Sequence, residues 1–266
     1  MGDVEYLEHY MWCVHPDKTK TFGSLLLPRG TEDCQVDIAW PTMVLGHGIG
    51  GDHSHMDPFA RAVAATGACT YNIDFRASGP TSKSDLDMVE MSVEGEADDL
   101  AYAADLMLEE HFCADDALFL CGGSMGGLAA TVEACRRPEL YRALVLVYPA
   151  FNMHDEAVAV WGGLDELPET AELFAGAEVG RPYMRDVLGC DPFDLMAAYD
   201  RPVLIVHGTA DDVVPLCYSE RAAATFPNAR LVEIPGAGHA FGGEALARAC
   251  DAVAGFVRDV VAGEKR

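Results

Sequence analysis

The sequence predicts an α/β protein with a mostly parallel central sheet flanked by helices. Short β-rich apolar runs recur along the chain, helical stretches separate them, and most of the runs are apolar nearly throughout. Strands that are buried on both faces of a parallel sheet show this continuous apolar pattern. Regular alternation of strand and helix is typical of the α/β class.

The predicted strands are the apolar runs themselves, and together they provide one sheet. In chain order they cover residues 43–45, 69–75, 117–121, 143–148, 203–206 and 230–234. Two earlier runs predict an antiparallel hairpin at the edge of this sheet, formed by residues 10–14 and 22–27.

The predicted helices lie between these strands. The clearest one carries apolar residues along a single 3.6-residue stripe, at positions 97, 100, 101, 104, 107 and 108. Further helices are expected at residues 58–65, 126–135, 218–226 and 244–261.

The alternation of strand and helix breaks once, between Ala150 and Asp200, where no convincing strand is found. A structureless loop of this length is uncommon in a compact domain, so we expect a small cap of short helices. The predicted organisation is therefore a core in two parts, residues 1–150 and 201–266, with a lid insertion at 151–200.

Composition and charge exclude several classes of partner. Half of the residues are hydrophobic and the formal net charge is −25, so the surface repels nucleic acid and anionic membranes. Nine cysteines without C-x-x-C pairs fit reduced thiols in a cytosol. No secretory signal and no membrane-spanning run is recognisable, which predicts a cytoplasmic location. Whether the chain forms a homodimer is left open.

The sharpest motif is Gly122-Gly123-Ser124-Met125-Gly126-Gly127, directly after a predicted strand and before a predicted helix. It matches G-x-S-x-G, the sharp strand-to-helix turn that exposes a serine hydroxyl as a nucleophile. The alternative interpretation is a glycine-rich turn whose serine merely caps the helix. We favour the nucleophile because of its place between strand and helix.

A serine hydroxyl needs a base and an acid that orients this base. Where this turn occurs, the partners follow in the order acid, then histidine. Asp211 follows one late strand and His239 follows the next, so both belong at the edge where Ser124 lies. Asp212 competes with Asp211, and His207 competes with His239. We favour Asp211 and His239, and expect His207 to be a packed, hydrogen-bonded histidine.

An oxyanion formed at the reacting carbon needs two backbone donors, one directly after the nucleophile and one from an earlier strand-to-helix loop. Met125 follows Ser124, and Ile49 lies in the loop after the strand at 43–45. We therefore predict the Met125 and Ile49 N–H groups as the oxyanion hole.

Two other patterns point to cofactors. Gly46-x-Gly48-x-x-Gly51 with Asp74 after the next strand matches a dinucleotide fingerprint, but a polar stretch separates these glycines from the helix whose N-terminus a pyrophosphate must meet. His53-x-His55-x-Asp57 resembles part of the metallo-β-lactamase motif, although Pro58 stands where that motif expects histidine. We favour a polar loop in both cases and predict neither cofactor nor metal.

These motifs together resemble the α/β-hydrolase superfamily, and more narrowly the bacterial cinnamoyl (feruloyl) esterases. The segments that carry the resemblance are residues 47–50, 74–79, 122–127, 148–150 and 207–215. The resemblance implies an α/β-hydrolase fold with a helical lid, and catalytic roles for Ser124, Asp211 and His239. It also implies that polar lid residues hold the phenolic hydroxyl of an aromatic acid. The predicted substrate-binding residues are His47, Asp155, Glu156 and Tyr183.

The resulting hypothesis is a serine carboxylesterase that hydrolyses small soluble esters, including hydroxycinnamoyl esters, through an acyl-enzyme and without a cofactor. Related acylglycerol lipases and acyl-peptidase-like hydrolases share most of the same segments, so these activities remain alternatives. A catalytically silent scaffold that binds a small ligand or a partner is the alternative from another class. A nicotinamide enzyme is a further one.

Overall fold

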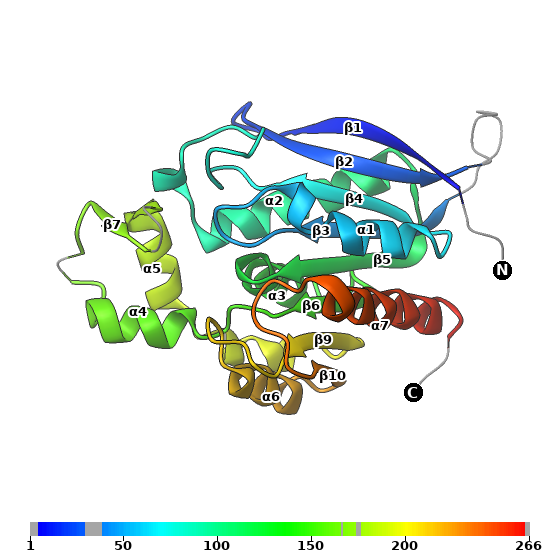
Figure 1. Ribbon diagram of the computed structural model, residues 1–266. Helices are drawn as coiled ribbons and strands as arrows, with labels where there is room; N and C mark the ends of the chain where they lie inside the picture. Colours follow the sequence, from blue (N-terminus) through cyan, green and yellow to red (C-terminus); the bar gives the residue numbers. More distant parts are fainter. Residues whose placement is uncertain (1–4, 30–38, 166, 174–176, 264–266) are drawn as a thin grey trace.

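The computed structural model describes residues 5–29, 39–165, 167–173 and 177–263. Their central feature is an eight-stranded sheet in the order β1-β2-β4-β3-β5-β6-β9-β10 (Figure 1). The strands are β1 (Tyr6–Val14), β2 (Lys20–Pro28), β3 (Trp40–Gly46), β4 (Cys69–Asp74), β5 (Cys113–Gly123), β6 (Ala143–Val147), β9 (Val203–Gly208) and β10 (Ala229–Ile234).

The strands from β4 to β10 in this order are parallel to one another, and β2 pairs antiparallel with both β1 and β4. This confirms the mostly parallel sheet and the hairpin at its edge. Every residue of β4 and β6 is buried, and β6 is apolar throughout, as expected for a strand covered on both faces.

Helices cover both faces of the sheet (Figure 1). On one face lie α1 (Asp57–Ala64) and α7 (Gly243–Val261), which pack against each other. The other face is covered by α2 (Val93–Glu109), α3 (Met125–Arg136) and α6 (Leu216–Thr225). Two separate hydrophobic clusters result, one on each side of the sheet, represented by Phe59 and Leu128.

The lid lies between β6 and β9 and projects from one side of the molecule (Figure 1). It comprises α4 (Met153–Trp161), β7 (Thr170–Glu172), β8 (Glu178–Gly180), α5 (Arg181–Gly189), η3 (Pro192–Asp194) and η4 (Met196–Ala198). The expectation of helices alone needs correction, because β7 and β8 pair as a two-stranded antiparallel sheet. Strands of three residues are too short to show an alternating pattern.

Two further short helices, η1 (His53–His55) and η2 (Met88–Glu90), belong to the loops after β3 and β4. The second of them contacts the lid through β8 and α5. Among the described residues, no helix has both the length and the apolarity needed to cross a bilayer.

Candidate active site

Ser124 lies alone between the end of β5 and the start of α3. Its φ of 52° falls in the left-handed region, which a residue with a side chain adopts only when the surrounding structure enforces it. This conformation bends the chain sharply from strand to helix and lifts the hydroxyl to the carboxyl edge of the sheet. The geometry matches the nucleophile turn expected from G-x-S-x-G.

The glycines on either side of Ser124 make this bend possible. A Cβ at Gly122 would collide with the carbonyl oxygen of Gly126, and a Cβ at Gly126 would collide with the carbonyl oxygen of His47. The turn therefore packs backbone against backbone, between β5 and the loop that follows β3.

The structure brings the three predicted side chains together although they are far apart in the chain. His239 Nε2 lies 3.0 Å from Ser124 Oγ, and His239 Nδ1 lies 2.7 Å from Asp211 Oδ2. A hydrogen-bonded serine, imidazole and carboxylate in this order can generate an alkoxide-like nucleophile and return its proton later. The neighbouring Asp212 is exposed to solvent and forms none of these contacts.

Asp211 is held from both sides. Its Oδ1 accepts hydrogen bonds from the backbone N–H groups of Val213 and Val214, at 3.0 and 2.9 Å. Its Oδ2 faces His239 and also lies 3.2 Å from His207 Nε2. Oδ2 is therefore directed at the imidazole of His239.

His207 is a packed histidine, as expected from its place at the end of β9. Its side chain is fully buried, Nδ1 lies 2.7 Å from Ser219 Oγ, and Nε2 lies 2.9 Å from the carbonyl oxygen of Val214. Burial lowers the pKa of His207, and Nε2 is the nitrogen that donates because both of its neighbours, the Val214 carbonyl and the Asp211 carboxylate, are acceptors. What the sequence did not reveal is its support of Asp211, which only the folded loop creates.

The loop after β3 presses against Ser124. A Cβ added at Gly48 would lie 2.9 Å from the Cβ of Ser124, so this backbone passes directly beside the nucleophile. Among the described residues, neither the Ile49 nor the Met125 N–H group donates to an acceptor. Both amides can therefore serve a developing oxyanion.

The prediction of His47 as a substrate-binding residue needs correction. Its side chain is 0% exposed, lies outside the cavity, and bonds to the backbone on both sides. Nδ1 donates to the carbonyl oxygen of Gly48 at 2.7 Å, and Nε2 accepts from the Phe75 N–H group at 3.1 Å. Burial lowers the pKa of His47 to about 4, which keeps the ring neutral. His47 thus braces the loop that carries Ile49.

A cavity of about 900 Å³ opens above Ser124 and His239. Most of its surface is apolar, with large side chains from the lid and from the core. Such a cavity suits an apolar small molecule whose reacting bond lies over the serine.

The predicted lid contacts separate into two groups. Tyr183 and Glu156 line the cavity, and the Tyr183 hydroxyl donates to the sulfur of Met153 at 3.3 Å. Asp155 does not line it, because its carboxylate accepts a hydrogen bond from the Tyr218 hydroxyl at 2.8 Å. The prediction of Asp155 as a substrate contact therefore needs correction: on α4 it faces α6 instead of the cavity.

Tyr148 is a site residue that the sequence motifs did not predict. It follows β6 with a φ of 39°, and its ring packs 4.7 Å from the ring of His239, centre to centre. The contact restricts where the imidazole can lie. A signal was present in the sequence, since Tyr148 opens a matched segment, but a contact with His239 requires β6 and the loop after β10 to meet.

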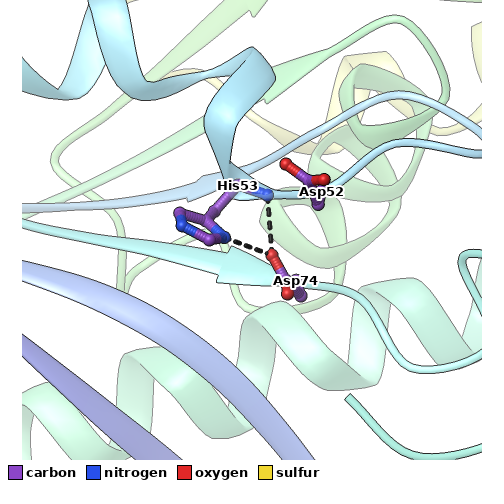
Figure 2. Close-up of side chains that lie close together, drawn as sticks. All are labelled: Asp52, His53 and Asp74. Carbon is purple, nitrogen blue, oxygen red and sulfur yellow. Dashed lines mark hydrogen bonds and ion pairs between the residues drawn. The ribbon is translucent and has the colours of Figure 1, made fainter. Parts of the chain in front are cut away.

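The histidines and aspartates of the suspected metal motif have separate roles. His53 donates to Asp74 Oδ1 twice, through its backbone N–H at 2.7 Å and through Nδ1 at 2.6 Å. Figure 2 shows both contacts. The Lys83 N–H group donates to Asp74 Oδ2 at 2.8 Å. Asp52 lies close to His53 and Asp74, so three side chains of the kinds that bind metal ions are grouped here. Because Nδ1 donates its proton to Asp74, this set anchors the loop after β3 to the end of β4.

The same contacts bear on the dinucleotide fingerprint. Asp74 is fully buried and its oxygens are already bonded, so it cannot receive a ribose hydroxyl. The glycine loop meets Ser124, whereas α1 begins only at Asp57. The other two residues of the suspected metal motif lie apart from this set: His55 faces the cavity, and Asp57 pairs with Arg61 at 2.6 Å.

Comparison with known proteins agrees with this geometry. The model of the prolyl oligopeptidase family matches residues 55–263, which include all three candidate side chains. A curated relative, the polyketide synthase ThaQ from Burkholderia thailandensis, is 33% identical over 163 residues. This match covers 47% of the chain and 8% of that much longer protein.

Two solved structures share the fold over nearly the whole chain. Est1E from Butyrivibrio proteoclasticus, solved with ferulic acid bound, has a TM-score of 0.83 at 24% identity and covers 95% of this chain and 99% of its own. A monoacylglycerol lipase from Paleococcus ferrophilus has a TM-score of 0.66 at 17% identity, covering 96% and 99%. These likenesses confirm the α/β-hydrolase fold.

Proposed function

Since the chain belongs to the prolyl oligopeptidase family and has the α/β-hydrolase fold, we propose that it is a serine carboxylesterase acting on small apolar esters. One observation carries the proposal. The Ser124, His239 and Asp211 side chains form a continuous hydrogen-bonded series at the floor of a largely apolar cavity. A merely structural serine has no need of this arrangement.

In the proposed reaction Ser124 Oγ attacks the ester carbonyl carbon while His239 Nε2 takes the hydroxyl proton. Asp211 holds His239 so that Nε2 faces the serine, and it stabilises the imidazolium. The Ile49 and Met125 N–H groups stabilise the oxyanion. The bond to the alcohol oxygen then breaks as His239 returns the proton to that oxygen. Water, activated by His239, attacks the acyl-enzyme and releases the acid and Ser124.

For the acyl group we propose an apolar acid, with hydroxycinnamic acids as the specific candidate class. Trp161 and Tyr183 meet edge to face, with their ring centres 6.4 Å apart, in the lid side of the cavity. An aromatic acid can pack against such rings, and Glu156 at the same wall can accept a hydrogen bond from a phenol. The likeness to Est1E, which was solved with ferulic acid, supports this class.

The test is turnover of methyl ferulate and of p-nitrophenyl esters of increasing chain length, with Ser124→Ala as the matched variant. We expect turnover by the parent and none above background by the variant, whose circular dichroism spectrum should be unchanged. A fluorophosphonate should label only the parent. An unlabelled parent without ester turnover would instead support the non-catalytic scaffold.

Amide or acylglycerol hydrolysis is the second candidate. The family match favours amide substrates, and the likeness to a monoacylglycerol lipase favours acylglycerols. Peptide p-nitroanilides and monoacylglycerols in the same panel distinguish these activities. An amidase would show a higher kcat/KM for the p-nitroanilides than for methyl ferulate, and an acylglycerol lipase would show a higher kcat/KM for the monoacylglycerols.

A further inference from the structure

The side chains that line the cavity above Ser124 fall into two sets that pack with different hydrophobic clusters, and the space beside each set is called an arm here. The lid arm is lined by side chains that pack with the cluster on the α2 and α3 face, namely Met153, Ala157, Trp161, Leu173 and Tyr183. The core arm is lined by side chains that pack with the cluster under α1 and α7, namely Met56, Phe59, Tyr148, Phe241 and Leu246. Ser124 lies at the sheet edge between the two arms.

The functional groups around Ser124 divide in the same way. His239 is on the side of the core arm, where its ring packs against Tyr148, and Tyr148 packs against Phe241 with centres 4.9 Å apart. The candidate oxyanion donors, Ile49 and Met125, pack with the cluster on the opposite face. The base and the oxyanion donors therefore approach the nucleophile from different sides.

This division orients an ester in the cavity. When the tetrahedral intermediate collapses, His239 Nε2 must give its proton to the alcohol oxygen, so that oxygen lies within hydrogen-bond reach of Nε2. The remainder of the alcohol then continues into the core arm, beside Tyr148 and Phe241. The acyl chain extends the other way, into the lid arm.

The core arm suits an apolar alcohol. Met56 and Phe59 are buried side chains and Tyr148 is 8% exposed, so the wall of this arm is mainly apolar. Ser54 and His55 add polar atoms in an exposed position. A sugar hydroxyl buried against this wall would lose its hydrogen bonds to water without replacement. Among the described lining residues there is no lysine or arginine to receive a phosphate.

We propose that the core arm is the leaving-group subsite and selects esters of alkyl or aryl alcohols over esters of polyols and sugars. This inference rests on the proposed esterase function, because the orientation depends on His239 as the proton donor. It concerns the alcohol half of the substrate, which the lid and its aromatic rings do not contact.

The test uses two esters of one acid that differ only in the polarity of the alcohol. Hexyl and 2-(2-hydroxyethoxy)ethyl alcohols have the same number of chain atoms, so length is matched. We expect kcat/KM to be at least about tenfold higher for the hexyl ester, since an apolar subsite discriminates against the polar chain by roughly this factor.

Two leucine variants locate the discrimination within the cavity. Leu246→Asn changes the core arm and should reduce the preference to within about threefold. Leu173→Asn is the matched control in the lid arm, since both leucines are half-buried, and should lower kcat/KM for both esters while leaving their ratio unchanged.

The outcomes distinguish the inference from the proposed function. Equal kcat/KM for the two esters in the active parent overturns the inference alone, and so does a ratio that changes with Leu173→Asn and not with Leu246→Asn. Absence of turnover with every ester, together with no labelling by a fluorophosphonate, overturns the esterase function and the inference with it.

Discussion

At the scale of single residues, Asp211 and Asp212 show how the fold selects between chemically identical neighbours. Both follow β9, yet only Asp211 accepts the N–H groups of Val213 and Val214 and faces His239. Asp212 is exposed. The difference arises from the turn after β9, which directs successive side chains in different directions.

The two aspartates allow a matched test, in which Asp211 is replaced and Asp212 serves as the control. Asp211→Asn should lower kcat by about 10⁴-fold, because the amide does not hold the His239 tautomer that accepts the serine proton. Asp212→Asn should leave kcat within about twofold. Steady-state kinetics on a p-nitrophenyl ester measures both, and similar losses in the two variants would contradict the assignment of Asp211.

At the scale of elements, the site depends on a close approach between two strand-to-helix turns. The turn from β5 to α3 and the loop after β3 touch through their backbones at Gly126 and His47, while the His47 side chain bonds to Gly48 and Phe75. The nucleophile and one oxyanion donor are therefore positioned by one shared contact.

Gly126→Ala should disturb both turns. The added methyl collides with the His47 carbonyl oxygen, so we expect a loss of roughly 1–3 kcal/mol in the free energy of unfolding, together with a lower kcat. Gly189→Ala is the control, since a Cβ at the end of α5 meets no atom within 4 Å. Urea unfolding and ester turnover measure the two effects. A stable and fully active Gly126→Ala would show that the two turns do not constrain each other.

At the scale of the whole molecule, buried histidines connect folding to pH. His15, His47 and His207 are 3%, 0% and 0% exposed, and burial lowers the pKa of each, to about 4 for His15 and His47. In the unfolded chain an imidazole has a pKa of about 6.5. Between these values the unfolded state binds more protons than the folded state, so stability increases with pH across this window.

The three histidines therefore contribute a fall in the free energy of unfolding as the pH is lowered from about 6.5 toward 4, while buried Asp99, whose pKa burial raises to about 7, contributes in the opposite direction. His15→Gln should make this dependence shallower, because one buried neutral imidazole is removed. The exposed His9 provides the control variant His9→Gln, whose pH dependence should parallel that of the parent. Chemical denaturation at a series of pH values gives the slopes, and identical slopes for the two variants would contradict the role of His15.

The amino-acid sequence alone predicts the alternation of strand and helix, the edge hairpin, and the turn that carries Ser124. These features depend on residues that are near neighbours in the chain, where apolar periodicity and glycine placement act directly. Its order of motifs also indicated Asp211 and His239 as the partners of Ser124.

The folded arrangement of the chain fixes where these segments meet. It placed His47 behind the oxyanion loop instead of in the cavity, turned Asp155 toward Tyr218, set His207 against Asp211, and packed Tyr148 on His239. The physical reason is that such contacts join segments far apart in the chain. Their geometry depends on how helices pack on the two faces of the sheet, which no local pattern of residues contains.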